Sequence, residues 1–277
     1  MTYTERIKNI YETLYANYGP QGWWPLTGSQ EINHDLPLRQ RGYHPLDYTL
    51  PTITDSKGQW EICMGAILTQ NTSWTQVEKA LARLQEQQLL HCDFLLPAQT
   101  DILKEAIKPA GYFNQKTKKV MAFRTYFSDL KGAVPSRADL LAIWGIGPET
   151  ADSMLLYAFH VPVFVVDAYT RRIFSRLFYT EPPTNLENYD HLQHLFHTTY
   201  TYHNDQEKND TLIIFKEYHA LLVEHGKTRC KKKPACTTCP LATSCDYATV
   251  HTSHNSHTSH NSHNSHTSQK QLETQYE

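Results

Sequence analysis

Four cysteines crowd into a short stretch near the carboxyl end of the 277-residue sequence. They are Cys230, Cys236, Cys239 and Cys245, separated by five, two and five residues. Thiolates this close together form a closed ligand set, for which tetrahedral zinc and an iron–sulfur cluster are the candidates. Zinc ribbons usually join two short C-x2-C knuckles across a longer gap, whereas one such pair here lies between two medium-length loops. The spacing therefore favours an iron–sulfur cluster, with zinc as the alternative occupant.

A turn that contains Gly145 and Gly147 is a second segment that could do chemistry. Short helices are expected on both sides, with Pro148 in the first turn of the second helix, where its missing N–H is not needed. Free backbone N–H groups at a helix N-terminus bind phosphate. The turn thus indicates contact with a phosphate backbone, although two glycines so placed suit any helical hairpin.

Asp167 is the third candidate. It follows the apolar run VPVFVV at 161–166 and precedes an amphipathic helix that carries Arg171, Arg172 and Arg176. The run has strand composition, but no second strand-like segment could pair with it, so we interpret it as a buried connector. Asp167 could simply cap the helix. Alternatively, its carboxylate could belong to an active site.

The elements that must position these residues are predicted to be helices throughout, so the fold class is all-α. Apolar periodicity, broken by Gly, Pro and Asn, defines their bounds. The predicted helices are Thr4–Tyr18, Trp60–Gln70, Thr75–Gln88, Thr100–Ile107, Gln115–Leu130, Arg137–Ile143, Pro148–Phe159, Ala168–Phe178, Tyr189–Thr199 and Thr211–His225.

The charge balance limits how the chain can bind its partners. With 26 basic and 28 acidic side chains, the formal charge of -2 excludes a uniformly basic coat, so a DNA-binding face must be a local patch. Lys116, Lys118 and Lys119 are the predicted phosphate contacts. The apolar runs are too short to span a membrane, and the first residues carry charge where a signal peptide is apolar. We expect a soluble, cytoplasmic, nucleoid-associated protein with no membrane partner.

Two segments lack helical periodicity. Residues 21–59 form a proline-punctuated loop, which is usually functional or an insertion. Residues 248–277 contain a three-residue repeat of His, Ser, Thr and Asn and are expected to be disordered, because they cannot bury enough apolar surface. Their histidines could chelate a transition metal, but a solvated spacer is the favoured interpretation: His251, His254, His257, His260, His263 and His266.

Several motifs together resemble the helix-hairpin-helix DNA glycosylases of the endonuclease III superfamily. They are AILTQNTSW at 66–74, KPAGYFNQKTKK at 108–119, GIGPETAD at 145–152, VVDAY at 165–169 and the cysteine loop. The resemblance covers Ile7 to Asp246. It looks closest to the endonuclease III-like 3-methyladenine DNA glycosylases (type III), which share WWP, LTQNT, FNQK and VVD.

The resemblance implies two helical domains with the active site in the cleft between them. A six-helix barrel at 60–164 would include the helix-hairpin-helix at 140–158. Residues 1–20 and 165–247 would form the second domain, whose cysteines would hold a [4Fe-4S] cluster. The loop at 21–59 would lie near the base pocket.

The resemblance also implies roles for individual residues. Asp167 would be the catalytic aspartate. Gln70 and Tyr112 match positions that enter the DNA where the damaged nucleotide flips out. The hairpin contacts to DNA would come from Gly145, Gly147 and Thr150.

Tryptophans are the candidates for the walls of the base pocket. By the type III resemblance, Trp23, Trp24 and Trp74 would sandwich the flipped base, although tryptophans in such positions are often simply core. Trp60 and Trp144 lie at helical apolar positions and are expected in the core.

Glu149 departs from the bifunctional members of the family, which place a lysine nucleophile at this position. No Schiff base can form on a carboxylate. We therefore expect a monomeric, monofunctional base-excision-repair enzyme that hydrolyses the N-glycosidic bond of alkylated purines, such as 3-methyladenine, in double-stranded DNA. One alternative is an endonuclease III-like glycosylase and lyase acting on oxidised pyrimidines or mismatches. Another is a non-catalytic iron–sulfur module that binds DNA.

Overall fold

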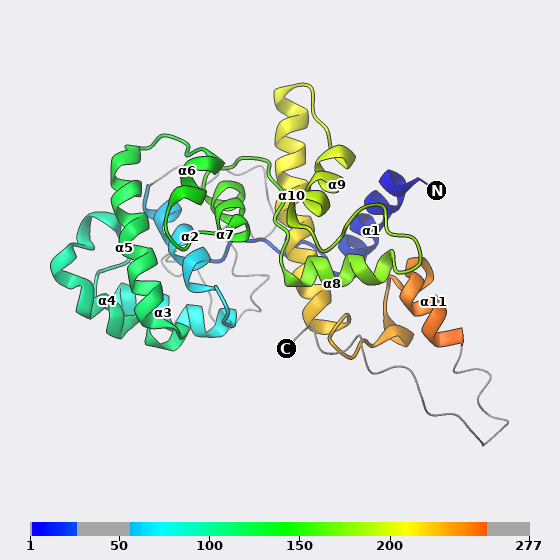
Figure 1. Cartoon of the computed structure of the whole chain (residues 1–277), viewed down its shortest axis with the longest axis horizontal. Coiled ribbons are helices and arrows are strands. Elements are labelled where there is room, and N and C mark those ends of the chain that lie inside the picture. Colours follow the sequence, from blue (N-terminus) through cyan, green and yellow to red (C-terminus); the bar gives the residue numbers. More distant parts are fainter. Residues whose placement is uncertain (1, 27–55, 254–277) are drawn as a thin grey trace, which may run out of the picture.

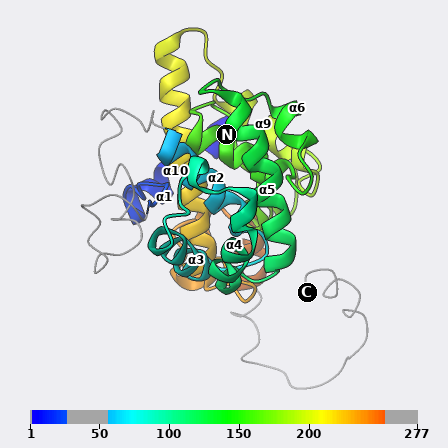
Figure 2. The same ribbon diagram turned by 90° about the vertical axis from the view of Figure 1, so that its left-hand side faces the viewer.

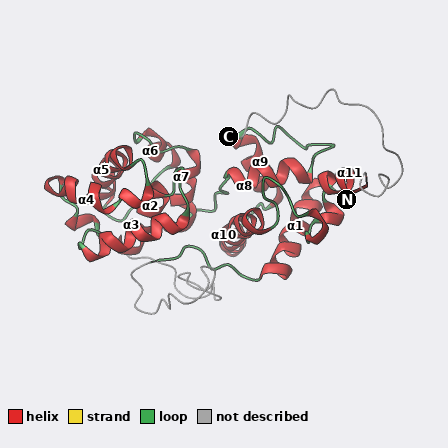
Figure 3. Ribbon diagram, turned by 90° about the horizontal axis from the view of Figure 1, so that it is seen from below, coloured by secondary structure: helices red, strands yellow, loops and turns green. Residues whose placement is uncertain are grey.

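The computed structural model describes residues 2–26 and 56–253 (Figure 1). Within these ranges the chain forms helices and loops and no β-strand, which confirms the predicted all-α class (Figure 3). The helices gather into two groups that lie side by side along the longest axis of the molecule. Figure 2 looks along that axis, with α3, α4 and α5 of the first group nearest to the viewer.

The first group is built around one buried helix. That helix, α2, is apolar nearly all round and contacts α5, α7 and η5, as expected of a central helix. Trp60 on α2 stacks against Phe123 on α5, with ring centroids 5.8 Å apart. The members are α2 (Ser56–Leu68), α3 (Trp74–Glu86), η2 (Cys92–Phe94), η3 (Pro97–Gln99), α4 (Thr100–Ala106), η4 (Lys108–Ala110), α5 (Phe113–Leu130), α6 (Arg137–Ala142), α7 (Pro148–Ser153) and the π-helix η5 (Met154–Ala158).

The second group joins the first helix of the chain to the last ones. Its core is aromatic: Phe164 and Phe196 stack with centroids 3.5 Å apart, and Tyr218 packs edge-on against both rings. The Tyr218 hydroxyl also donates to the Ile7 carbonyl at 2.9 Å, which fixes α1 against α10. The members are α1 (Tyr3–Tyr18), α8 (Ala168–Leu177), α9 (Tyr189–Thr199), α10 (Asp205–Thr228), η6 (Cys236–Thr238), η7 (Ala242–Ser244) and α11 (Asp246–Ser253).

Residues 161–166 lead from η5 to α8 as an extended connector. Phe164, Val165 and Val166 are fully buried, so the expectation of a buried connector is confirmed. The backbone of Phe164 is satisfied without a sheet, because its N–H donates to His197 Nε2 at 3.1 Å and its carbonyl accepts from the Gln193 amide at 2.7 Å. This connector delivers Asp167 to the junction between the two groups.

The largest differences between predicted and observed helix boundaries are at α2, α10 and η5. α2 begins at Ser56, so the loop predicted at 21–59 ends earlier, and α10 begins at Asp205 rather than Thr211. The first turn of α10 is polar and is held by the Asn204 cap, which accepts from the Glu207 N–H, so apolar periodicity could not reveal it. The helix predicted from Pro148 to Phe159 becomes a π-helix after Ser153.

The prediction of disorder from residue 248 onward is wrong for residues 248–253. Residues 246–253 form α11, which packs on α8. Asp246 pairs with Arg6 at 2.6 Å, and Ala248 is buried, so contacts far along the chain stabilise a helix that local composition does not favour. Residues 27–55 and 254–277, with the other five histidines of the repeat, lie outside the described residues.

No helix in residues 2–26 and 56–253 has the length and apolar character needed to cross a membrane.

Candidate active site and DNA interface

Asp167 lies at the N-cap of α8, where its backbone is still extended. Its Oδ1 atom accepts two hydrogen bonds from Thr170, from the N–H at 2.7 Å and from the hydroxyl at 2.8 Å. The side chain is almost fully buried, with 9% of its surface exposed. Asp167 is therefore a helix cap by geometry, and its second oxygen remains available for another task.

Oδ2 of Asp167 faces a buried histidine. His219 Nε2, on α10, lies 3.7 Å away, and His219 Nδ1 lies 2.7 Å from the Tyr157 hydroxyl. Burial alone would raise the pKa of Asp167, but the facing imidazole and the bonds from Thr170 outweigh it and hold that pKa below its ordinary value. The carboxylate is thus ionised at neutral pH. Neither His219 nor Tyr157 was predicted from the sequence.

Glu149 is a second carboxylate close enough to interact with Asp167. Its side chain is exposed, yet the surrounding protein partly desolvates its carboxyl group. This desolvation and the negative charge of Asp167 raise the pKa of Glu149 to about 7, while His219 and Arg171 act in the opposite direction. Water still reaches the side chain and screens the repulsion. The two carboxyl groups have pKa values shifted in opposite directions, a pattern that is common in active sites.

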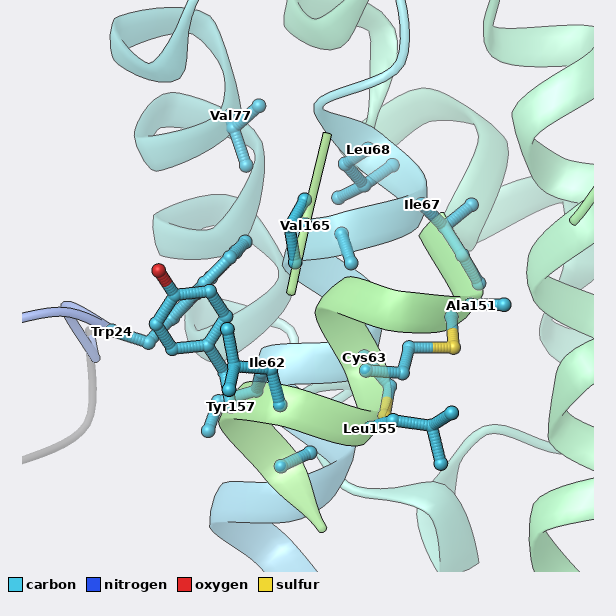
Figure 4. Close-up of a cluster of buried hydrophobic side chains, with 14 of the residues drawn as sticks. Trp24, Ile62, Cys63, Ile67, Leu68, Val77, Ala151, Leu155, Tyr157 and Val165 are labelled. Atoms are coloured by element: carbon cyan, nitrogen blue, oxygen red, sulfur yellow. The ribbon is translucent and has the colours of Figure 1, made fainter. Parts of the chain in front are cut away.

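An aromatic cluster lies beside this carboxylate pair. The Trp24 ring is 5.2 Å from both Trp74 and Tyr157, and Trp23 packs edge-on against His219 at 5.7 Å. Figure 4 shows Trp24 and Tyr157 next to each other at the edge of the first group's core. Trp24 is buried, whereas Trp23 and Trp74 are only half-buried. The three tryptophans predicted as pocket walls are thus brought together, and Trp23 connects the cluster to Asp167 through His219.

A glycine on α2 makes room for this cluster. A Cβ atom added at Gly65 would lie 3.1 Å from Cζ2 of Trp24, closer than ordinary van der Waals contact. The glycine therefore lets the Trp24 ring lie flat on α2. Gly65 is a site-shaping residue that the sequence analysis missed.

The hairpin between α6 and α7 carries the predicted phosphate contacts. Gly145 has a φ of +84°, in the left-handed region that favours glycine. Thr150 is buried, and its hydroxyl accepts from the Gln70 amide at 2.9 Å, so this side chain lies beneath the hairpin surface. Gln70 also donates to the Gly145 carbonyl at 3.1 Å and accepts from Lys119 Nζ. Gln70 is thus held against the hairpin in this structure.

Tyr112 is the most exposed large side chain of the predicted interface, with 70% of its surface open. It caps α5 in a left-handed conformation, with φ at 43°. An aromatic ring presented in this way is suited to wedge between bases.

Lys116 does not face DNA as predicted. Only 2% of its surface is exposed, and its Nζ donates to the carbonyls of Leu68 at 2.8 Å and Ala110 at 2.7 Å. Burial and the nearby Lys119 lower the pKa of Lys116 to about 8. Lys116 therefore joins the end of α2 to the loop before Tyr112.

Other predicted positions also differ in their surroundings. Lys118 is exposed, as a phosphate contact must be. Trp144, expected in the core, has 56% of its surface exposed, because it lies in the turn directly before Gly145 rather than on the buried face of a helix. Arg172 and Arg176 donate to backbone carbonyls of the cysteine region, so they hold that loop in place.

The four cysteines line a single pocket at the end of α10 and α8. Arg176 Nη1 donates to Cys230 Sγ at 3.2 Å, and Cys239 Sγ lies 3.7 Å from His225 Nε2. Burial raises the pKa of Cys236, Cys239 and Cys245, and neighbouring thiols raise them further. In the described residues, no three His, Cys, Asp or Glu side chains come close enough to hold a single ion. The sulfurs instead surround a space between them.

Comparison with known proteins identifies the family. A sequence model of the family described as HhH-GPD superfamily base excision DNA repair protein matches residues 64–197. A Methanocaldococcus jannaschii protein named as a DNA repair glycosylase is 37% identical over 245 residues, which is 84% of this chain and 92% of the relative. The chain belongs to the HhH-GPD superfamily. It is a DNA glycosylase of base excision repair, and DNA is its partner.

Other relatives place the glycosylase within the endonuclease III superfamily, as the sequence motifs predicted. Endonuclease III of Sulfolobus acidocaldarius is 30% identical over 181 residues, covering 62% of this chain and 75% of the relative. The fold is similar to endonuclease III trapped on DNA (TM-score 0.64, 18% identity, 91% and 100% of the two chains). It is also similar to 3-methyladenine DNA glycosylase of H. pylori bound to 1,N6-ethenoadenine (TM-score 0.59, 24% identity, 82% and 98%).

Proposed function

We propose that this glycosylase is a monomeric, monofunctional enzyme that removes alkylated purines from double-stranded DNA. The observation that carries the proposal is the aromatic cluster of Trp23, Trp24 and Trp74 beside Asp167. Alkylated purines such as 3-methyladenine carry a positive charge, and electron-rich rings attract a flipped cationic base. A base held there would have its sugar near the Asp167 carboxylate.

Asp167 supplies the chemistry in this proposal. Cleavage of the N-glycosidic bond builds positive charge on the sugar, which a buried carboxylate stabilises. The carboxylate also orients the attacking water and accepts its proton. Its depressed pKa keeps it ionised for both tasks.

Glu149 supports the monofunctional assignment. By the family resemblance, it occupies the position of the lysine nucleophile of the bifunctional members, and a carboxylate cannot form a Schiff base. Water is then the nucleophile, and the product is an intact strand with an abasic site. Lyase activity on oxidised pyrimidines would need another amine.

Gln70, Tyr112 and the hairpin are proposed to grip and open the duplex. The exposed Tyr112 ring fills the gap left by the flipped nucleotide, and Gln70 contacts the orphaned base. Backbone N–H groups around Gly145 and Gly147 bind phosphate. Lys118 and Lys119 add phosphate contacts near Tyr112.

The cysteine pocket is proposed to hold a [4Fe-4S] cluster. Cys230, Cys236, Cys239 and Cys245 all border it, and four thiolates are the ordinary ligand set of such a cluster. The Arg176 guanidinium, bonded to Cys230 Sγ, is placed to stabilise a thiolate ligand. A bound cluster would order the loop after α10. The two-domain division belongs to the same proposal: an iron–sulfur domain of residues 1–20 and 165–247, and a six-helix barrel of residues 60–164. The sequence expectation of a cytoplasmic, nucleoid-associated enzyme belongs to the same proposal.

A panel of lesion duplexes tests the proposed substrate. Duplexes carrying 3-methyladenine, 7-methylguanine, thymine glycol, uracil or a G·T mismatch are incubated with the enzyme, with and without alkali, and with borohydride. We expect release of the alkylated purines, strand cleavage only after alkali, and no borohydride-trapped complex. Preferential release of thymine glycol, or efficient trapping, would favour an endonuclease III-like lyase.

Asp167→Asn tests the catalytic assignment. An asparagine Oδ1 can accept both bonds from Thr170, so the helix cap survives while the charge is lost. We expect single-turnover base release to fall about 100-fold or more, with binding to damaged DNA little changed. A wild-type rate would reduce Asp167 to a cap and favour a non-catalytic DNA-binding module.

A further inference from the structure

The oxygen of Asp167 that Thr170 does not occupy faces a nitrogen with no other partner. His219 is buried, with 4% of its surface exposed, and its Nε2 makes no hydrogen bond within the described part of the chain. Its nearest acidic atom is Asp167 Oδ2, at 3.7 Å. A buried N–H without a partner is costly, so such a group usually has a use.

The Tyr157 hydroxyl determines which ring nitrogen of His219 carries the proton. The hydroxyl lies 2.7 Å from His219 Nδ1 and 3.1 Å from the Lys216 carbonyl, and burial raises the pKa of Tyr157 well above its ordinary value. The hydroxyl therefore keeps its single proton. If it donates to Nδ1, the neutral imidazole carries its proton on Nε2.

The other arrangement is disfavoured by repulsion. If the Tyr157 hydroxyl donates to the Lys216 carbonyl, Nδ1 must carry a proton and donate to the hydroxyl oxygen. The Nε2 lone pair of this tautomer would point at the Asp167 carboxylate, which is repulsive. The arrangement in which Tyr157 donates to Nδ1 is therefore favoured, and it points an N–H on Nε2 at Asp167.

We propose that His219 is a positioning residue for Asp167, and that its Nε2–H, oriented by Tyr157, donates to Oδ2 while the base leaves. The inference rests on the proposed catalytic role of Asp167. Thr170 and His219 would then fix both oxygens of one carboxylate, which sets the direction from which it faces the sugar. Once both donors are engaged in the substrate complex, they need no further rearrangement as the bond breaks.

The 3.7 Å between His219 Nε2 and Asp167 Oδ2 in the free enzyme suits this role. An N–H···O hydrogen bond spans about 2.7–3.2 Å, so a contraction of about 0.5–1 Å would complete it. Catalytic hydrogen bonds are often long in the free enzyme and tighten when substrate binds. Trp23 packs edge-on against the His219 ring. A flipped base that contacts Trp23 would therefore contact a side chain that packs directly on the imidazole.

The pH dependence of the reaction reports on this contact. The donor from His219 helps to hold the pKa of Asp167 down against its burial, so its loss should raise that pKa. Four other titratable groups interact with the charge of Asp167, and they stay in place in the variants below except where Tyr157 itself is changed: Glu149 of α7, Tyr157 of η5, Tyr169 of α8 and Lys227 of α10.

The test uses His219→Phe, His219→Gln and Tyr157→Phe in the full-length enzyme. Single-turnover release of 7-methylguanine from duplex DNA is measured from pH 4.5 to 8. Phenylalanine keeps the ring but removes both nitrogens, so we expect release to slow at least about tenfold and the acid limb of the profile to move to higher pH. Glutamine can place an N–H near the Nε2 position and should restore most of the rate. Tyr157→Phe should give an intermediate loss.

Tyr218→Phe is the matched control. It removes a buried hydroxyl from the residue next to His219 on α10, and that hydroxyl bonds to the Ile7 carbonyl of α1 at 2.9 Å rather than to either carboxylate. It should lower the unfolding temperature as Tyr157→Phe does but leave the rate and the acid limb unchanged. If His219→Phe does not fold, the comparison of Tyr157→Phe with Tyr218→Phe decides.

Asp167→Asn, measured in parallel, separates the two proposals. An active Asp167→Asn enzyme would end the catalytic assignment itself. An inactive Asp167→Asn, together with His219→Phe that matches wild type in rate and acid limb, would overturn the positioning role alone. Equal losses in the Tyr157 and Tyr218 variants would also overturn it.

Discussion

Lys116 Nζ donates to the carbonyl oxygen of Leu68 at 2.8 Å, inside the protein and away from solvent. The same ammonium group reaches the carbonyl of Ala110 at 2.7 Å. Leu68 comes two residues before Gln70, and Ala110 comes two residues before Tyr112. One buried lysine therefore sets the spacing between the two side chains that we propose to enter DNA.

Lys116→Met should destabilise the protein. The thioether keeps most of the side-chain volume but leaves two buried carbonyls without their donor, which costs about 1–3 kcal/mol for each unsatisfied group. Denaturant unfolding gives the change in free energy. Base release should also fall, because the distance between Gln70 and Tyr112 is no longer fixed.

Lys118→Met, two residues along α5, is the matched control. Its side chain is exposed, so unfolding should be nearly unaffected. DNA binding should weaken for all sequences, and the slope of log Kd against log salt should fall by about one. Equal destabilisation by the two variants would contradict the internal role of Lys116.

The two hairpin glycines should respond differently to alanine. At Gly145, φ is +84° and an added Cβ would lie 2.6 Å from Lys119 carbons, so Gly145→Ala should cost at least about 1 kcal/mol and displace Lys119 from Gln70. At Gly147, φ is −97° and no atom lies within 4 Å of the added Cβ, so Gly147→Ala should leave stability almost unchanged. Thermal unfolding of both variants checks this. Similar losses would mean that the hairpin backbone differs from that described.

DNA affinity should depend on the ionisation of Glu149. Its pKa is raised to about 7, so the group is mostly neutral at pH 6 and mostly charged at pH 8. The charged form repels phosphate, so wild-type affinity should fall as pH rises through 7, by about two- to threefold for one screened charge. Glu149→Gln should remove this part of the pH dependence, because it cannot ionise. Fluorescence anisotropy at constant ionic strength measures both, and parallel curves would mean that Glu149 does not face the DNA.

The purified protein should be brown and contain about four irons per chain, as a [4Fe-4S] cluster requires. Cys236→Ser should lose the iron and much of the soluble protein, because the loop depends on its ligands. Cys63→Ala is the control, since Cys63 is buried on α2, far along the chain from the loop, and should keep its iron despite some loss of stability. Stoichiometric zinc without iron after anaerobic purification would contradict the cluster.

Much of the fold could be predicted because helices bury apolar side chains at regular intervals. The tryptophan cluster and the Asp167 cap were likewise accessible through motifs that extend over several residues. The buried connector at 161–166 was predictable because its apolar run found no strand partner. Patterns in the local sequence indicate all of these features.

Other features depend on partners far along the chain. Lys116 looks like its neighbours Lys118 and Lys119 in sequence, and only packing shows that one of them points inward. His219 lies among apolar residues of α10 with no local sign of Asp167, which is 52 positions earlier. The prediction that Trp144 is in the core was wrong because residue type alone does not distinguish a tryptophan in an exposed turn from one in a core.

The attachment of α1 to α10 has a consequence for synthesis on the ribosome. Ile7, Ile10 and Leu14 are made early, yet Tyr218 of α10, which bonds to the Ile7 carbonyl, and the Asp246 carboxylate, which pairs with Arg6, follow more than 200 residues later. The group from α2 to η5 is continuous in sequence and can fold while α1 waits with its apolar stripe uncovered. The nascent chain therefore needs protection at α1 until α10 and α11 have left the exit tunnel.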